Sequence, residues 1–225
     1  MKLYRQIDLD RYMNDDWLLG RLDAEAKDQD AGYTTHRWLV DSPPKRMIFG
    51  DLYGDLLDST GLRVLDVGGG YSSLGRALAG RHDYHIVDIM AHDAHGPFAA
   101  LSDALGGIWT DADWLSFPLD ERWDVIVAND IFPNVDQRLA QFIDRYLPMA
   151  GELRLSLTFY NTPRAYTVKR VDGDEIFSML AWDGTQVARC LEPHGIAPDR
   201  LEGLSTERDS IFPNGRQVGA VTLRQ

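Results

Sequence analysis

One stretch decides the fold class of this 225-residue chain, and it is Val64-Leu65-Asp66-Val67-Gly68-Gly69-Gly70-Tyr71. A short apolar run ends in an acid and three glycines, which is typical of a buried strand followed by a sharp turn. Glycine there lets the backbone approach a ligand that a Cβ atom would exclude. The next apolar run ends in Asp88, where an acid of a doubly wound sheet accepts hydrogen bonds from ribose hydroxyls. The stretch therefore predicts a nucleoside-binding turn.

Downstream of that turn, strand-like and helix-like segments alternate. The strand-like runs are 62–67, 85–89, 123–128 and 152–159, and the helix-like segments are 73–78, 97–105 and 135–147. Such alternation predicts crossover connections and a doubly wound, mostly parallel α/β sheet. Asn214-Gly215 lies between two further strand-like runs, 201–212 and 216–223, and Asn-Gly is a strong hairpin signal. We therefore expect the sheet to end in an antiparallel hairpin.

Two segments lie outside this alternation. Residues 1–60 are polar and helical, and Ser42-Pro43-Pro44 predicts a helix start with a serine cap. A second hairpin is expected at 165–182, with its turn at Asp172-Gly173-Asp174. The sequence thus predicts an N-terminal helical extension over 1–60 and one α/β domain over 61–225, with the second hairpin as an insertion.

The composition excludes several classes of protein. Lys+Arg 23 against Asp+Glu 35 gives a formal net charge of −12, which repels phosphate backbones and disfavours nucleic acid as a partner. No apolar run approaches the roughly 20 residues that span a bilayer, and the N-terminus lacks the apolar core of a secretory signal. A single cysteine, Cys190, forms no internal disulfide. We therefore expect a cytoplasmic globular enzyme.

Two ligand classes compete for the glycine turn. A dinucleotide fingerprint requires a third glycine at position 73, where this chain has Ser73. The strand also ends in Asp66, which would repel a pyrophosphate. An acid facing the loop suits a cationic ligand, and S-adenosylmethionine combines ribose and adenine with a sulfonium and an ammonium group. The turn therefore favours S-adenosylmethionine over a dinucleotide.

The ordered motifs resemble those of class I S-adenosylmethionine-dependent methyltransferases, over roughly residues 60–225. In this sequence they read V-L-D-V-G-G-G, H-I-V-D-I, T-D-A-D-W-L-S-F-P, W-D-V-I-V-A-N-D and A-G-E-L-R-L-S-L. The resemblance implies a Rossmann-like, seven-stranded sheet whose seventh strand lies antiparallel beside the fifth. It also implies S-adenosylmethionine as the cofactor and methyl transfer as the activity.

The resemblance further assigns cofactor-binding roles by position. Asp66, Gly68 and Gly70 would line the methionine and ribose part, Asp88 would hold the ribose, Ile89 would pack on adenine, and Asp111 with the Ala112 N–H would read the adenine edge. Asp113 is a rival for Asp111, and Trp114 either covers adenine or belongs to the core. Asn129 is expected to contact the cofactor. Arg37 would pair with the methionine carboxylate, unless it is an ordinary surface arginine.

Residues on the acceptor side are expected at the end of the family's fourth strand and near it. Asp130 either hydrogen-bonds a substrate amine or hydroxyl, acts as general base, or caps a helix that begins near Asn134 and Val135. His92, which closely follows the second strand, is the reserve candidate for that base. Asp130 and Ile131 also replace both prolines of the N-P-P-Tyr/Phe pattern of base-amino methylases, which disfavours nucleobase methylation. The candidates for substrate binding are Tyr33, His36, Phe132, Tyr160, Asn161 and Arg164.

No metal site is predicted, because only His92 and His95 could share a helix face and no cysteine joins them. The leading function is methyl transfer to an oxygen or nitrogen of a small polar metabolite, such as a sugar or a nucleotide-linked sugar. The N-terminal helices and 165–182 would form a lid over that acceptor. Two alternatives stay open: a protein or RNA methyltransferase, which would need a basic groove, and a cofactor-binding protein without catalysis. We expect a monomer or homodimer with no membrane partner.

Overall fold

The structure of the protein is a computed structural model that describes residues 1–22, 30–169 and 176–225. Seven strands form one sheet: β1 (Lys2–Leu3), β2 (Arg63–Val67), β3 (Asp83–Val87), β4 (Trp109–Thr110), β5 (Trp123–Phe132), β6 (Ala150–Phe159) and β9 (Gln217–Leu223). Their order across the sheet is β1-β9-β6-β5-β2-β3-β4. The strands from β2 to β6 run parallel, whereas β9 is antiparallel to both β6 and β1. The fold class predicted from the sequence is confirmed.

The antiparallel edge of the sheet differs in one strand from the predicted hairpin. β9 pairs with β6, as expected, but residues 201–212 form no strand. They lie instead in the end of α10 (Pro198–Glu202), in the 3-10 turn η4 (Gly203–Ser205) and in a loop. In that loop the Arg208 N–H and C=O bind the Asn161 side chain, so they are satisfied outside a sheet. The position next to β9 belongs to β1, from the other end of the chain.

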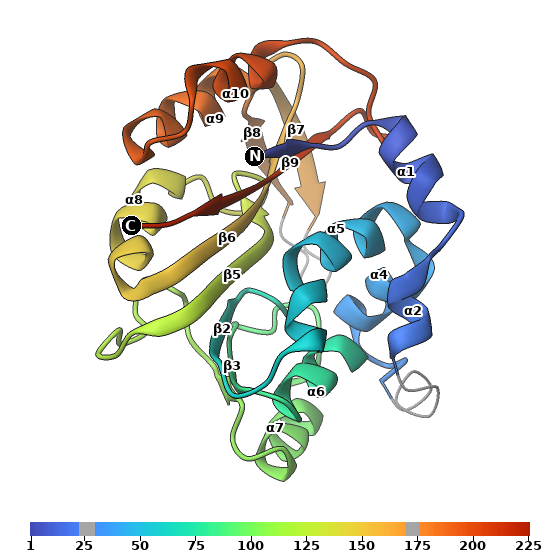
Figure 1. Ribbon diagram of the computed structural model, residues 1–225, viewed down its shortest axis with the longest axis vertical. Helices are drawn as coiled ribbons and strands as arrows, with labels where there is room; N and C mark the ends of the chain where they lie inside the picture. Colours follow the sequence, from blue (N-terminus) through green and yellow to red (C-terminus); the bar gives the residue numbers. More distant parts are fainter. Residues whose placement is uncertain (23–29, 170–175) are drawn as a thin grey trace.

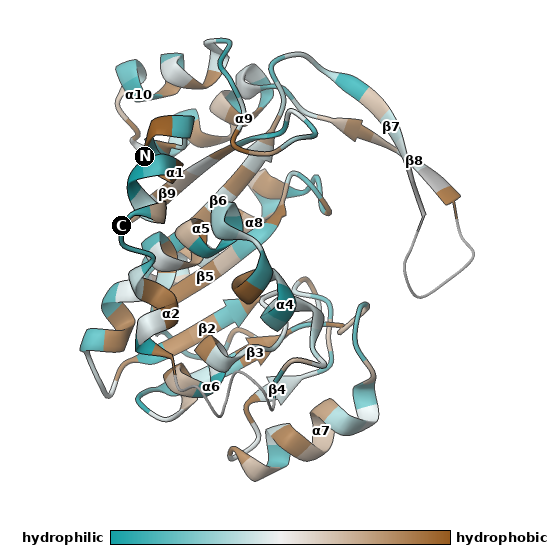
Figure 2. Cartoon of the chain, turned by 90° about the vertical axis from the view of Figure 1, so that its right-hand side faces the viewer, coloured by the Kyte–Doolittle hydropathy of each residue, from teal (hydrophilic) through white to brown (hydrophobic). Residues whose placement is uncertain are grey.

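The insertion predicted at 165–182 is a two-stranded antiparallel ribbon of β7 (Arg164–Lys169) and β8 (Ile176–Ala181). Its predicted turn at 172–174 lies outside the described residues. Figure 2 shows that the ribbon extends away from the body of the molecule. The predicted insertion is therefore a hairpin, and it branches off directly after β6.

Helices cover both faces of the sheet (Figure 1). One face carries α1 (Gln6–Met13), α2 (Trp17–Arg21), α4 (Thr34–Asp41), α5 (Pro43–Tyr53), η1 (Gly54–Asp58), α6 (Ser73–Ala79) and α7 (His95–Ala104). The other carries α8 (Leu139–Tyr146), η2 (Leu147–Met149), α9 (Gly184–Leu191), α10 and η4, and η3 (Glu192–His194) follows α9 directly. Successive residues of a strand point to opposite faces, so Val64 packs in one core and Leu65 in the other. Among the described helices, none is long and apolar enough to cross a membrane.

Two helix starts refine the sequence-based expectations. α5 begins at Pro43, as predicted, but the side chain of Ser42 at its N-cap accepts no hydrogen bond from the helix. α8 begins at Leu139, later than the predicted residue 135. The delay has a local cause, because the N–H groups of Val135 and Asp136 both bind the Ile131 carbonyl in a turn.

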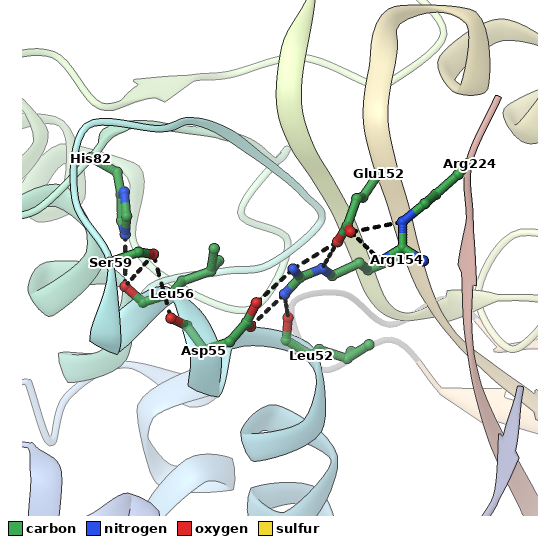
Figure 3. A network of polar contacts seen from close by, with 8 residues as sticks. All are labelled: Leu52, Asp55, Leu56, Ser59, His82, Glu152, Arg154 and Arg224. Atoms are coloured by element: carbon green, nitrogen blue, oxygen red, sulfur yellow. Dashed lines mark hydrogen bonds and ion pairs between the residues drawn. The ribbon is translucent and has the colours of Figure 1, made fainter.

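A buried arginine fixes the end of α5 to the sheet. Arg154, on β6, is 8% exposed and donates to Asp55 at 2.6 and 2.8 Å and to the Leu52 carbonyl at 2.8 Å (Figure 3). It also binds Glu152, whose other oxygen accepts from Arg224. These charge-assisted hydrogen bonds compensate for the burial of the guanidinium group. They hold α5 and η1 against β6, so α5 has a fixed position over the sheet.

Candidate functional site

A cavity of about 420 Å³ opens at the carboxyl ends of the parallel strands. It lies where β2 has β3 on one side and β5 on the other, the switch point at which open α/β sheets bind ligands. Its volume is typical of small-molecule sites. The described lining includes Thr35, Trp38, Lys45, Gly68, Gly70, Asp88, Ile89, His92, Ala112, Asp113, Trp114, Asn129, Asp130, Asn134 and Arg216.

The glycine turn forms one end of the cavity. Gly68 and Gly70 have φ of 66° and 61°, left-handed values that residues with side chains disfavour. Asp88 holds the turn, since its Oδ2 accepts the Gly70 N–H at 2.9 Å and its Oδ1 accepts the Met90 N–H at 2.7 Å. Burial raises the pKa of Asp88. Ile89 is 48% exposed and lines the cavity beside it. The structure thus brings these four predicted residues together in one wall.

Asp66 lies outside the described cavity wall, which corrects its predicted contact with the cofactor. The residue is 4% exposed and its carboxyl group lies beneath the turn, where Tyr53 and Tyr84 donate to it at 3.0 and 2.7 Å. Burial raises the pKa of Asp66 to about 7, although both hydroxyl groups oppose that shift. A Cβ atom at Gly69 would overlap this carboxyl group. Asp66 therefore supports the turn from below and does not line the cavity.

At the predicted adenine end, the cavity is lined by Asp113, the alternative to Asp111. Ala112, Asp113 and Trp114 line the cavity, whereas Asp111 is absent from the described lining and pairs with His95 Nδ1 at 3.1 Å. Asp113 is also engaged within the protein, since its Oδ1 accepts the Leu115 N–H at 2.8 Å and its Oδ2 accepts from Arg138 Nη2 at 3.3 Å. Trp114 is 5% exposed and packs in the core that contains Leu65, and it also lines the cavity. Both predicted roles of Trp114 are therefore compatible with its position.

The cavity wall also contains a carboxylate between two cations, which we call the Lys45–Asp130–Arg216 cluster; an adjoining pocket is lined by the same three residues and by Gly68 and Gly69. Lys45 Nζ lies 3.3 Å from Asp130 Oδ2, and Arg216 Nη1 lies 3.3 Å from each carboxylate oxygen. Thr158 donates to Oδ1 at 3.1 Å. Burial by itself would raise the pKa of Asp130, but Arg216 and Lys45 together hold it below its ordinary value. Asp130 is therefore ionised at neutral pH.

Two of the roles predicted for Asp130, general base and helix cap, do not fit this environment, whereas a hydrogen bond to the acceptor stays a prediction. The N-cap of α8 is Arg138, so Asp130 does not cap that helix. A general base must accept a proton, and protonation of Asp130 would break its ion pairs with both cations. Its lowered pKa also makes it a weak base near neutral pH. Asp130 instead holds Lys45 and Arg216 in position at the cavity.

Among the cavity-lining residues that sequence reasoning missed are Trp38, Lys45 and Arg216. Two of them had a local signal, because Lys45 follows the prolines that start α5 and Arg216 follows Asn214-Gly215. Neither signal identifies a site, since Lys45, Asp130 and Arg216 are far apart in the sequence. The packing of α5 and of the residue before β9 against the end of β5 brings them together.

His92 and Asn129, also predicted from the sequence, lie in the cavity wall. His92 is exposed at the rim, and its ring centre lies 5.7 Å from that of Trp38. Asn129 faces the neighbouring strand with its Oδ1, which accepts from Ser156 Oγ at 2.7 Å. The role of His92 as a base and the contact of Asn129 with the cofactor stay predictions.

The predicted residues of the segment 33–37 lie outside the described lining. Arg37 is exposed and donates to the Gly32 carbonyl at 3.1 Å and to Thr34 Oγ1 at 2.9 Å. His36 is buried, and its Nδ1 accepts the Ser73 N–H at 3.2 Å. Tyr33 packs edge-on against Tyr71 at a ring-centre distance of 5.0 Å. α4 does approach the site, but through Thr35 and Trp38 on its other face.

The other predicted acceptor residues also lie outside the described lining. Phe132 is fully buried in the core that contains Leu65. The side chain of Asn161 donates to the Arg208 carbonyl in the loop before β9. Arg164 stacks on Tyr160, with its guanidinium carbon 3.9 Å from the ring centre. None of the described residues of β7 and β8 lines the cavity, although the Tyr166 hydroxyl on β7 donates to Asn134 Oδ1 at 3.4 Å in the cavity wall; a lid formed by the ribbon stays a prediction. Among the described residues, no group of three or more His, Cys, Asp or Glu side chains is arranged to hold a metal ion.

No known protein family and no curated protein matches the sequence, whereas solved structures do match it. The DhpI–SAH complex has 20% identity and a TM-score of 0.51, and the match covers 97% of this chain and 95% of DhpI. The N-methyltransferase NodS from Bradyrhizobium japonicum WM9, in complex with S-adenosyl-L-homocysteine (SAH), has 15% identity and a TM-score of 0.51 over 89% and 96%. A Burkholderia thailandensis 1,6-didemethyltoxoflavin-N1-methyltransferase has 14% identity and a TM-score of 0.50 over 83% and 80%.

At such low sequence identities, the similarity of this chain to the three solved structures concerns the arrangement of the backbone. It agrees with the strand order, in which β9 is inserted antiparallel beside β6 at one edge of a parallel sheet. The glycine turn, the acid after β3 and the cavity between them occupy the ligand-binding end of that sheet. The chain therefore has the fold of class I S-adenosylmethionine-dependent methyltransferases.

Proposed function

We propose that this protein binds S-adenosylmethionine and transfers its methyl group to a small molecule. The observation that carries the proposal is the cavity that is lined by Gly68, Gly70 and Asp88 together with Asp130. The DhpI and NodS structures, which share the fold, are described as SAH complexes. The absence of side chains at the two glycines leaves room for a ligand against the backbone.

The residues of the cavity wall fit S-adenosylmethionine, whereas Ser73 stands where a dinucleotide fingerprint has its third glycine. Asp88 Oδ1 and Oδ2 each accept one backbone N–H and keep lone pairs for the two ribose hydroxyls. Ile89 supplies an exposed apolar surface for the adenine ring. Bound S-adenosylmethionine supplies an electrophilic methyl group on a positively charged sulfur. The chain's own residues then contribute chiefly by holding the acceptor in line with that methyl group.

A small acceptor fits this cavity better than a macromolecule does. α4 covers one side of it with Thr35 and Trp38, and its volume of about 420 Å³ is shared with the cofactor. The methyltransferase from Burkholderia thailandensis is described with bound 1,6-didemethyltoxoflavin, a small molecule. A formal net charge of −12 disfavours RNA as the acceptor. A polar metabolite is therefore the acceptor we propose.

Calorimetric titration with SAH and with NAD tests this function. SAH should bind and NAD should not. The Asp88→Ala variant should bind SAH tens- to a hundredfold more weakly, because lost hydrogen bonds to a carboxylate are worth about 2–3 kcal/mol. The matched control is Asp111→Ala, since Asp111 pairs with His95 outside the described lining; its SAH affinity should stay within about twofold of wild type. Binding of NAD without SAH would refute the proposal.

A further inference from the structure

Arg216 is a buried cation whose hydrogen-bonding capacity is only partly used. Its side chain is 11% exposed, and its guanidinium carbon lies 3.9 Å from the ring centre of Phe212. Nη1 binds Asp130, but Nε is buried and has no hydrogen-bond partner among the described residues. No described residue accepts from Nη2 either. Nε and Nη2 form one edge of the guanidinium group, the edge that binds a carboxylate or phosphate in a bidentate manner.

Lys45 supplies a second cation at the same place. Its Nζ lies 3.3 Å from Asp130 Oδ2 and 3.4 Å from the ring centre of Trp38, and its side chain is 18% exposed. Burial lowers the pKa of Lys45, and the charge of Arg216 lowers it further, whereas Asp130 opposes the shift. The two cations therefore repel each other across the cavity wall, and one carboxylate does not neutralise both.

This surplus of positive charge distinguishes the cluster from three other arginines that are at least partly buried. Arg46 binds Asp16, Arg76 binds Asp30, and Arg154 binds both Asp55 and Glu152. Each of those cations has at least one carboxylate of its own, as burial of charge requires. The cluster has two cations for one carboxylate, and both cations line the cavity.

We infer that Lys45 and Arg216 bind an oxyanion of the acceptor, so that the molecule methylated carries a carboxylate or a phosphate-like acid group. This inference rests on the proposed function. One acid oxygen is held by the two cations, and another attacks the methyl carbon. A C–O bond forms, the C–S bond breaks, and its electron pair goes to sulfur, which becomes neutral. The products are a methyl ester and SAH.

An acid acceptor also explains why the cluster contains no free base. Carboxylic and phosphoric acids are already ionised at neutral pH, so no proton has to be removed before the attack. Asp130 is committed to two ion pairs and does not accept a proton. A cationic amine, by contrast, would be repelled by Lys45 and Arg216.

An oxyanion in this position has two possible sources, the acceptor and the methionine carboxylate of the cofactor. The test separates them by titrating inorganic phosphate and benzoate into protein that is saturated with SAH. At least one anion should bind to wild type. Arg216→Gln and Lys45→Gln should each weaken that binding about tenfold or more, because each removes a charge-assisted hydrogen bond. SAH affinity of both variants should stay within about twofold of wild type.

Two further variants sharpen the assignment. Arg216→Lys keeps the charge but lacks the planar fork, so its anion affinity should lie between those of wild type and Arg216→Gln. Arg189→Gln, on the exposed face of α9, removes a cation away from the cavity and should leave anion binding unchanged. Asp130 keeps one cation in each single variant, so the variants retain a neutral pair and should fold.

Each other outcome contradicts a specific statement. Absence of anion binding to SAH-saturated wild type, or equal binding by the glutamine variants, refutes the oxyanion site. A tenfold loss of SAH affinity in those variants assigns the oxyanion to the cofactor and overturns the acid acceptor. Failure of wild type to bind SAH refutes the proposed function, and anion binding measured without SAH still decides whether the cations form a site.

Discussion

Two aspartates on neighbouring strands, Asp66 on β2 and Asp130 on β5, show how the same side chain acquires opposite properties. Both carboxyl groups are largely buried at the carboxyl end of the sheet. Asp66 is surrounded by the hydroxyl groups of Tyr53 and Tyr84, and burial raises its pKa to about 7. Asp130 lies between Lys45 and Arg216, whose charges outweigh burial and lower its pKa.

The comparison teaches that burial alone does not decide the charge of an acid. Hydroxyl groups donate hydrogen bonds but carry no net charge, so they compensate for lost water only in part. A lysine and an arginine add Coulomb attraction in a site from which most water is excluded. The glycine turn thus rests on an acid that titrates near neutrality, whereas the acceptor end rests on a permanent anion.

The largest effect is expected from removing the anion of the acceptor end. Asp130→Ala leaves Lys45 and Arg216 facing each other without a carboxylate, and loss of one partner of a buried pair costs about 3–5 kcal/mol. We expect the lower end of that range, because the side chain of Asp130 is 24% exposed at the cavity. Urea unfolding of both proteins measures the difference.

Asp83→Ala is the matched control for that variant, because Asp83 pairs with Arg63 at 3.1 Å while 67% exposed. Exposed ion pairs contribute about 0–1 kcal/mol, so this change should be small. If the two variants lose equal stability, the contrast between the buried cluster and a surface pair is wrong.

The second prediction concerns the pH dependence of stability at Asp66. Its folded-state pKa of about 7 lies above its ordinary value of 3.8, so the folded protein keeps a proton that the unfolded chain loses. Wild-type stability should therefore fall as the pH rises from 5 to 8, by about 2–3 kcal/mol from this residue. Asp66→Asn, which does not ionise, should lack this contribution.

Urea unfolding at several pH values measures this, and the difference between Asp66→Asn and wild type isolates the one carboxyl group. Asp103→Asn, an exposed acid on α7, serves as the control and should follow the wild-type profile. Parallel profiles for Asp66→Asn and wild type would mean that the carboxyl group does not change protonation state between pH 5 and 8.

The smallest change in SAH affinity and stability is expected from replacing Arg37. This variant tests whether the site contains a third cation besides Lys45 and Arg216. Its guanidinium group binds the Gly32 carbonyl and Thr34 Oγ1 at the surface. Arg37→Ala should therefore keep SAH affinity within about twofold and melting temperature nearly unchanged. A tenfold loss of affinity in calorimetry would show that α4 turns this face toward the cofactor when it binds.

The sequence predicted the cofactor end of the cavity better than the acceptor end. Gly68, Gly70, Asp88 and Ile89 belong to two adjacent strand ends, and parallel strands bring such ends together by construction. The acceptor cluster combines residues from α5, β5 and the turn before β9, which no local pattern connects. The same limit applies to Tyr160, Asn161 and Arg164, which lie outside the described lining, because a position after a strand does not determine where a side chain points.

By itself the sequence determined the alternation of strands and helices between residues 62 and 159, the glycine turn and the start of α5. These features depend on apolar periodicity, on glycine at positive φ and on proline at the first helical position, which are properties of short segments. The tertiary structure decided that β1 and not residues 201–212 occupies the sheet edge, and that Asp66 lies under the turn. It also decided which acid carries a charge, since the pKa of a buried carboxyl group depends on the partners that distant segments pack around it.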